Sequence, residues 1–114
     1  MANLIIELNS TKQPYYVDQF GTPARPADTI QWKSTGGKFS VTIRDTIQFF
    51  SGKTGAALKN IEKILVDSAG QATSDTYTIK NDLLTGTEKQ YEVYYVTNQD
   101  QADAPPRIII TPAV

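Results

Sequence analysis

The sequence predicts an all-β protein, namely a Greek-key β-sandwich of about seven or eight strands with at most one short helical turn. Two observations support this prediction. Short stretches of alternating apolar and polar residues recur along the chain, which is typical of half-buried strands. Turn-forming residues separate these stretches at roughly 8–12 residues, the spacing expected of a sandwich. No repeat, low-complexity tract or linker interrupts the 114 residues, so we expect one domain, residues 1–114.

The N-terminal part begins with two strand signals and a loop. Residues 3–9 alternate, so their apolar side chains share one face. Residues 15–17 form a short β-rich piece. Residues 18–27 predict a loop, because their glycine and prolines forbid a long regular element there.

The next two segments predict a hairpin with a buried face. Residues 29–33 alternate, with Ile30 and Trp32 directed inward. Residues 34–37, Ser-Thr-Gly-Gly, predict the hairpin turn, since glycine adopts positive φ without steric cost. Residues 39–43 continue the inward set on the returning strand.

The rest of the chain is β-rich after one ambiguous stretch. Residues 45–60 carry mixed signals, and we expect the single helical turn at residues 56–60. Further strands are expected at residues 62–67, 75–80, 91–97 and 107–111, of which 91–97 has the strongest signal. Polar loops connect them.

Composition and charge exclude several classes of function. The chain has 11 basic and 12 acidic residues and no basic run, which disfavours nucleic-acid binding and docking on an acidic membrane surface. It has no apolar run near the roughly 20 residues of a membrane-spanning helix. No signal peptide is visible, so we expect a cytoplasmic protein unless a leader has been removed. The absence of Cys fits a reducing compartment.

Two groups of segments carry a resemblance to a known family. The first runs from Asp-Thr-Ile-Gln-Trp at residues 28–32 through Gly36 and Gly37 into Lys-Phe-Ser-Val-Thr-Ile at residues 38–43. The second runs from residues 86–97, which are rich in tyrosine, to Arg-Ile-Ile-Ile at residues 107–110. Together they resemble the cupredoxin sandwich over most of the chain. An immunoglobulin-like sandwich is the main alternative.

The cupredoxin resemblance implies a copper site that this chain lacks the residues to form. Such a site uses two His, one Cys thiolate and a weak axial Met. The resemblance places the first His at residues 38–40 and the Cys at Tyr95 or Val96. It places the second His at residues 98–101 and the axial Met at residues 102–105. The chain has no His and no Cys, and its one Met is residue 1. We therefore expect the scaffold without type 1 copper and without another cofactor.

Catalytic motifs are not evident either. Without His or Cys, the usual nucleophile–base arrangements are excluded. A carboxylate pair is the remaining route to an enzyme, although acids next to turns and on outer strand faces are typical of solvated surface. Asn98, Asp100 and Asp103 gather oxygen donors in one loop, and whether this loop binds calcium stays open at this stage.

Aromatic doublets are the main indication of a binding surface. Strand neighbours point to opposite faces, so one ring of each doublet is expected outside, and Tyr16 and Tyr94 are the outward candidates. Phe20 lies in the Gly/Pro loop, where it either covers the end of the sandwich, which we favour, or contacts a partner. Tyr16, Phe20 and Tyr94 are thus the candidate interaction surface. Cross-strand tyrosines that simply stabilise an exposed sheet face are the alternative.

These observations favour a non-enzymatic binding or assembly module whose partner is an unidentified protein or a second copy of the chain. The first alternative is a small carbohydrate-binding domain in which Tyr16 and Tyr94 stack on sugars. The second is an enzyme working through carboxylates, which would need an acid with a strongly raised pKa.

Overall fold

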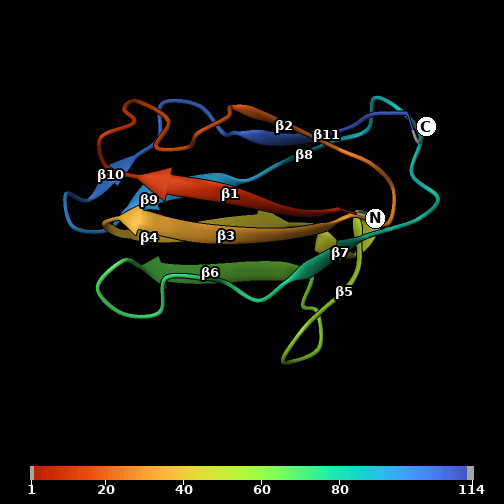
Figure 1. Cartoon of the computed structure of the whole chain (residues 1–114), viewed down its shortest axis with the longest axis horizontal. Helices are drawn as coiled ribbons and strands as arrows, with labels where there is room; N and C mark the ends of the chain where they lie inside the picture. The colour runs from red at the N-terminus through yellow and green to blue at the C-terminus, as the bar shows by residue number, and fades with distance from the viewer. Residues whose placement is uncertain (1, 113–114) are drawn as a thin grey trace.

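A computed structural model describes residues 2–112, which form an all-β structure (Figure 1). The predicted fold class is confirmed, but the strands are shorter and more numerous than expected. Within the described residues there are eleven: β1 (Asn3–Asn9), β2 (Gly21–Ala24), β3 (Thr29–Gly36), β4 (Lys38–Arg44), β5 (Phe50–Lys53), β6 (Ile61–Asp67), β7 (Tyr77–Ile79), β8 (Glu88–Gln90), β9 (Glu92–Tyr95), β10 (Asp100–Gln101) and β11 (Arg107–Ile110).

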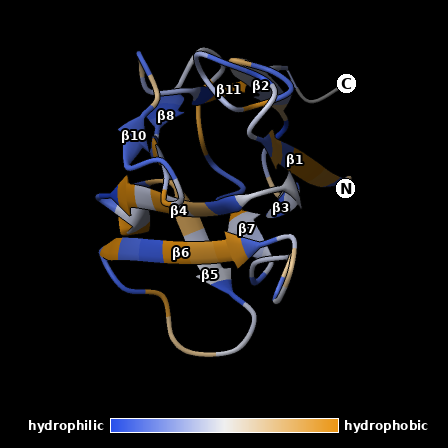
Figure 2. Ribbon diagram, turned by 90° about the vertical axis from the view of Figure 1, so that its left-hand side faces the viewer, coloured by the Kyte–Doolittle hydropathy of each residue, from blue (hydrophilic) through white to orange (hydrophobic). Residues whose placement is uncertain are grey.

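The strands build three sheets. One has the order β1-β3-β7-β5, the second β10-β9-β4-β6, and the third, smaller sheet β2-β11-β8. β1 runs parallel to β3, and β2 runs parallel to β11, while the other strand pairs are antiparallel. Figure 2 shows β4 and β6 side by side, with β2, β11 and β8 gathered above them.

The turn predicted at residues 34–37 is present, but the strands on its two sides do not pair, so the predicted hairpin is wrong. Gly37 does make the turn, with φ +116°. A Cβ atom there would lie 2.8 Å from the Tyr95 ring, so both the backbone and the packing require glycine. However, β3 and β4 belong to different sheets. The turn therefore carries the chain from one sheet to the other. The prediction of a hairpin failed because an alternation pattern indicates which face of a strand is buried and not which strand is its neighbour.

The strand predicted at residues 91–97 is present as the shorter β9, and another short strand, β8, comes just before it. On either side of Tyr91, β8 pairs with β11 and β9 pairs with β4. Tyr91 donates its N–H to the carbonyl of Pro106 at 3.0 Å, and its side chain is buried. Tyr91 thus marks a crossing from one sheet to another, which the strand prediction for residues 91–97 did not include.

The helical turn expected at residues 56–60 is also wrong. That stretch is irregular, and the one helical element in residues 2–112 is a short 3-10 turn, η1 (Thr46–Gln48). Buried Thr46 holds the irregular stretch in place, because its hydroxyl donates to the carbonyl of Lys59 and its N–H to that of Asn60. No helix in the described part of the chain is long and apolar enough to cross a membrane.

The buried side chains form one cluster shared by the sheets. Trp32 is fully buried and meets Tyr77 and Tyr91 edge to face, with ring centroids 5.6 and 5.4 Å apart. This is a favourable aromatic geometry. The sequence-based inward set is confirmed in full for Ile30, Trp32, Phe39, Val41 and Ile43.

Candidate functional site

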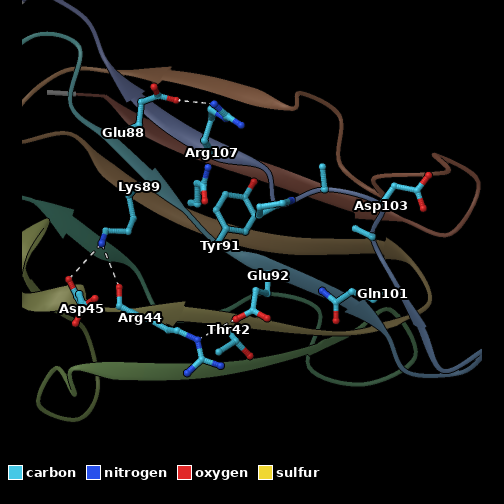
Figure 3. Close-up of a pocket in the computed structure, with 14 residues that line it drawn as sticks. Thr42, Arg44, Asp45, Glu88, Lys89, Tyr91, Glu92, Gln101, Asp103 and Arg107 are labelled. Atoms are coloured by element: carbon cyan, nitrogen blue, oxygen red, sulfur yellow. Dashed lines mark hydrogen bonds and ion pairs between the residues drawn. The ribbon is translucent and has the colours of Figure 1, made fainter.

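A polar cleft of about 800 Å³ lies beside β4, β8 and β9 and is bounded on its far side by residues 101–105 (Figure 3). Most of its lining side chains are polar, with charged, amide or hydroxyl groups: Thr42, Arg44, Asp45, Glu88, Lys89, Gln90, Glu92, Gln101, Asp103 and Arg107. The sequence did not predict this cleft, because its walls come from strands in two different sheets.

The charges of the cleft largely satisfy one another. Arg44 Nε lies 3.0 Å from Glu92 Oε1, and Arg107 Nη1 lies 3.0 Å from Glu88 Oε1. Lys89 Nζ donates to the carbonyl of Arg44 at 3.1 Å. Since the cations already have partners, the cleft presents no concentrated positive site for an anion.

Tyr91 forms part of the cleft wall, but its hydroxyl group is buried and does not face the cleft. Its hydroxyl and the indole N–H of Trp32 are buried, and neither has a hydrogen-bond partner among the described residues. Burial raises the pKa of Tyr91, an effect that the nearby Trp32 N–H partly offsets. A neutral, inaccessible phenol is suited to packing and not to proton transfer.

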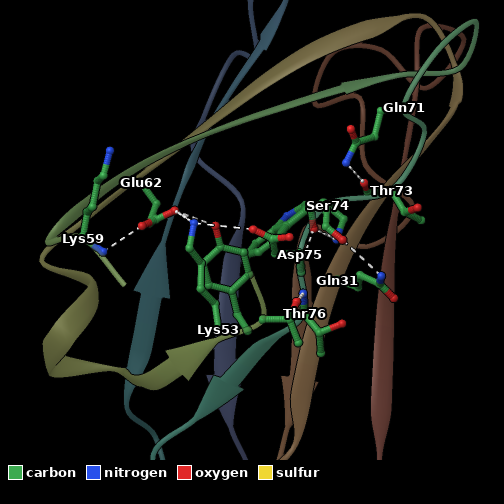
Figure 4. Close-up of polar contacts among 12 residues, drawn as sticks. Gln31, Lys53, Lys59, Glu62, Gln71, Thr73, Ser74, Asp75 and Thr76 are labelled. Carbon is green, nitrogen blue, oxygen red and sulfur yellow. Dashed lines mark hydrogen bonds and ion pairs between the residues drawn. The ribbon is translucent and has the colours of Figure 1, made fainter. Parts of the chain in front are cut away.

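A second polar cluster is buried between β5, β6 and β7 (Figure 4). Glu62 is only 4% exposed, and it accepts hydrogen bonds from Lys53 Nζ at 2.9 Å, from the Lys59 N–H at 2.8 Å and from the Tyr77 hydroxyl at 2.7 Å. Lys53 also lies 3.5 Å from Asp75. The cluster ties an edge strand of one sheet to an edge strand of another.

The protonation of this cluster indicates a structural role. Burial alone would raise the pKa of Glu62, but the hydrogen bonds from Lys53, Lys59 and Tyr77 outweigh it and lower the pKa. The hydrogen bond to Glu62 likewise raises the pKa of Lys53. Carboxylate and ammonium are therefore both held charged. A general acid would need the opposite shift of Glu62, so this geometry gives no support to the carboxylate-enzyme hypothesis.

The positions that the cupredoxin resemblance assigns to copper ligands do not fit the metal. Phe39 pairs across strands with Tyr95, and Tyr95 with Asp100, so these positions do come together. The rings of Tyr16, Phe39 and Tyr95 pack there with centroid distances of 5.1–5.6 Å. Aromatic carbon fills this space, and the chain supplies neither imidazole nor thiolate.

Tyr16 is buried, so the expectation that its ring points outward is wrong. It is 1% exposed, and its φ of +65° interrupts the strand-like alternation on which that expectation rested. Its hydroxyl donates to Asp100, and this hydrogen bond, together with burial, raises the pKa of Tyr16 to about 12. Tyr16 therefore cannot stack on a sugar or contact a partner.

The hydrogen bond from Tyr16 to Asp100 also matters for the loop that was considered as a calcium site. One carboxylate oxygen of Asp100 is engaged by Tyr16, while Asp103 lines the cleft. Among residues 2–112, no group of three or more acidic, His or Cys side chains is placed to hold a metal ion.

Phe20 is half-buried and lies outside the buried core, so the expectation that it covers the end of the sandwich is not supported. Its ring is 4.8 Å from that of Tyr15, and the Arg107 guanidinium lies 5.2 Å above it. Phe20 thus belongs to a small surface cluster near the cleft that is stabilised by a cation–π contact.

Tyr94 is partly exposed and lies on the outer face of the second sheet. Strand register places Leu65, Ser40, Tyr94 and Gln101 in one row across this face. We call it the β4–β6–β9 face, and its outward residues are Ser40, Thr42, Arg44, Ile61, Lys63, Leu65, Glu92, Tyr94 and Gln101. Leu65 is 57% exposed and Ile61 46%, so β6 carries apolar side chains on both sides.

β6 is also an edge strand with an open side. The Val96 N–H donates to Lys38, which fixes the alternation of hydrogen bonds along β4 and directs the even-numbered residues of β6 toward it. The backbone groups of Lys63 and Leu65 therefore point away from β4, and no backbone partner meets them within residues 2–112. β1 is an edge strand of equal length, but Tyr16 and Asp18 bond to its end.

The sequence contains a signal for this face that alternation alone does not reveal. Residues 61–67 have apolar side chains at Ile61 and Leu65, in the positions where a half-buried strand normally carries polar ones. Comparison of the chain with protein-family models and with curated proteins finds no match, so function has to be inferred from these residues themselves.

Proposed function

We propose that this protein is a non-enzymatic binding or assembly module that works through the β4–β6–β9 face and the open edge of β6. The observation that carries the proposal is Leu65, an exposed leucine next to an unpaired strand edge. Unpaired strand edges with apolar side chains are sites where another chain can add a strand. Tyr94 in the same row adds an amphipathic ring of the kind common at protein contacts.

Two further features support this proposal over the alternatives. We further propose a Greek-key, cupredoxin-like scaffold without copper, and the rings of Tyr16, Phe39 and Tyr95 pack where that resemblance would place metal ligands. Burial of Tyr16 removes one of the two stacking platforms that the carbohydrate hypothesis required.

The experiment that tests the proposal compares two leucine variants in a pull-down. The purified chain is immobilised and exposed to a native extract, and the bound proteins, including tagged copies of the chain itself, are quantified. Leu65→Lys should release the specific partner, whereas Leu84→Lys should retain it, because Leu84 is 80% exposed in a loop away from β6. Equal capture by both variants would contradict the proposal.

For the scaffold, a titration of the purified chain with Cu(II) tests the absence of a copper site. We expect no stoichiometric uptake and no intense thiolate-to-copper absorption, since the donor set is missing. A saturable one-to-one site abolished by substitutions at Tyr95 would contradict this.

A further inference from the structure

We propose that Lys53 and Asp75 condense within the folded chain to form an isopeptide bond, which joins β5 to the segment leading into β7, with Glu62 transferring the protons. This inference concerns a modification of the chain itself and does not depend on the proposed function. Three features carry it: the contacts of the Lys53 amine, the backbone that fixes the reacting residues and the position of Glu62.

The Lys53 amine is held between two carboxylates. Its Nζ lies 2.9 Å from Glu62 Oε1 and 3.5 Å from Asp75 Oδ2, and Figure 4 shows the three groups together. The Lys53 side chain is largely buried, so little water separates it from them. Holding two reactants in contact makes their reaction unimolecular, and the effective concentration then reaches about 10⁵–10⁸ M. The fold thus favours a condensation that is very slow between free groups in water.

The backbone fixes both reacting residues on neighbouring strands. Lys53 is the last residue of β5, Asp75 comes shortly before β7, and these strands are antiparallel neighbours. Beyond them the Thr54 N–H donates to the Thr76 carbonyl at 3.0 Å, and the Thr76 N–H donates to the Thr54 hydroxyl at 2.9 Å. At Gly55, a Cβ atom would lie only 3.2 Å from both carboxylate oxygens of Asp75, so glycine leaves room for the Asp75 carboxyl group beside the amine.

Glu62 is positioned to take a proton from the amine. Its Oε1 accepts hydrogen bonds from Lys53 Nζ and the Tyr77 hydroxyl, and its Oε2 accepts one from the Lys59 N–H, which together fix its orientation. The distance of 2.9 Å to Lys53 lies within the range of about 2.6–3.2 Å required of a general base. A lysine becomes a nucleophile when such a base takes its proton. Asp75, which is partly exposed, is then the group attacked.

The reaction balances without another reagent. The Lys53 ammonium group carries three protons, and the first passes to Glu62 to leave a neutral amine. The amine lone pair attacks Cγ of Asp75 and forms the N–C bond. Glu62 returns its proton, and then a second one from the nitrogen, to an Asp75 oxygen, whose C–O bond breaks so that water leaves. The products are one amide, one water molecule and the Glu62 carboxylate as it began, and no atom changes oxidation state.

The charges of the cluster determine how fast this reaction proceeds. The hydrogen bond to Glu62 raises the pKa of Lys53, so the neutral amine is a minor form. Condensation is therefore slow, and the freshly made chain carries the ion pair. Once formed, the bond closes a covalent loop that includes β6. Such a crosslink stabilises a fold mainly by constraining the unfolded chain.

Intact mass spectrometry tests the proposal, because the reaction removes one water molecule from the chain. The purified full-length protein is measured when fresh and again after incubation in the folded state, and proteolytic fragments locate the bond. We expect the wild type to lose the mass of one water with time and to yield a branched fragment that joins Lys53 to Asp75. A folded wild type that keeps its full mass throughout would overturn the proposal.

Two variants distinguish this reaction from an ordinary ion pair and from dehydration elsewhere in the chain. Lys53→Arg keeps the cation but removes the amine, so it should keep its full mass. Loss of water that persists in Lys53→Arg would indicate cyclisation of an aspartate to a succinimide and would contradict the proposal. Asp75→Asn changes the leaving group, so the mass lost with the branched fragment should become that of ammonia; loss of water from this variant would equally contradict it.

The role of Glu62 is tested by its amide variant. Glu62→Gln cannot accept the proton, so the branched fragment should form at least about 100-fold more slowly than in the wild type. Native fluorescence of the buried Trp32 checks that this variant stays folded during the incubation. The matched control is Glu92→Gln, whose exposed ion pair with Arg44 lies outside the cluster and which should react at the wild-type rate. Equal rates for the two variants would refute proton transfer by Glu62.

Discussion

Removing the charge of Glu62 should destabilise the fold far more than removing an exposed acid. All three groups that bond to its carboxylate are donors: Lys53 Nζ, the Lys59 N–H and the Tyr77 hydroxyl. Glu62→Gln keeps the shape, but its NH₂ group must face one of these donors, and Lys53 loses its closest counter-charge. The Lys53 side chain is only 11% exposed, so water cannot replace what is lost.

The size of the effect follows from these contacts. Breaking a buried ion pair by removing one partner costs about 3–5 kcal/mol. Asp75 remains 3.5 Å from Lys53 and is partly exposed, so the lower end applies, about 3 kcal/mol. The matched control is Glu92→Gln, which disrupts an exposed pair with Arg44 and should cost about 0–1 kcal/mol.

The assay is equilibrium unfolding in denaturant, followed by the fluorescence of the single, fully buried Trp32. Lys53→Met and the double variant Lys53→Met/Glu62→Gln complete a cycle, and we expect the double variant to be less destabilised than the sum of the singles by about 2 kcal/mol. Additive effects, or a cost of Glu62→Gln no larger than that of Glu92→Gln, would refute the reasoning.

Three further predictions concern the turn at Gly37, the Tyr16–Asp100 contact and pH. Gly37→Ala should destabilise the fold by about 1–3 kcal/mol, since φ is +116° and the new Cβ meets the Tyr95 ring; an unchanged unfolding midpoint would contradict this. Tyr16→Phe should cost about 1–2 kcal/mol in the same assay at neutral pH. Because the pKa of Tyr16 is raised from 10.0 to about 12, its stabilisation is complete below pH 10 and declines as pH rises toward 12; Tyr16→Phe should remove part of that alkaline loss. The lowered pKa of Glu62 works at the acid end: its contribution is present above the ordinary value of 4.5 and is lost as pH falls, so Glu62→Gln should unfold with a flatter acid dependence than the wild type.

Local alternation predicted which side chains are buried with good success. Ile30 and Trp32 in one segment, and Phe39, Val41 and Ile43 in the next, are all directed into the core as expected. These predictions depend only on the two-residue repeat of a strand and on the preference of apolar side chains for the interior. The all-β fold class follows from the same repeat.

Strand pairing could not be predicted, because it depends on contacts between distant segments. The turn at Gly37 and the crossing at Tyr91 both move the chain between sheets while the alternation continues. The prediction that Tyr16 points outward failed for a different reason, since a positive φ at a residue other than glycine has no clear sequence signal. The open edge of β6 likewise becomes visible only when its single neighbour, β4, is known.

Amide hydrogen exchange of β6, measured residue by residue by NMR at low and high protein concentration, tests the central claim most directly. At low concentration the N–H groups of Ile64 and Val66, which face β4, should exchange slowly, while that of Leu65 exchanges rapidly. When a partner or a second copy occupies the edge, Leu65 alone of these three should gain protection. A Leu65 amide that is already protected at low concentration, or that never gains protection when the chain binds a partner, would contradict an open and functional β6 edge.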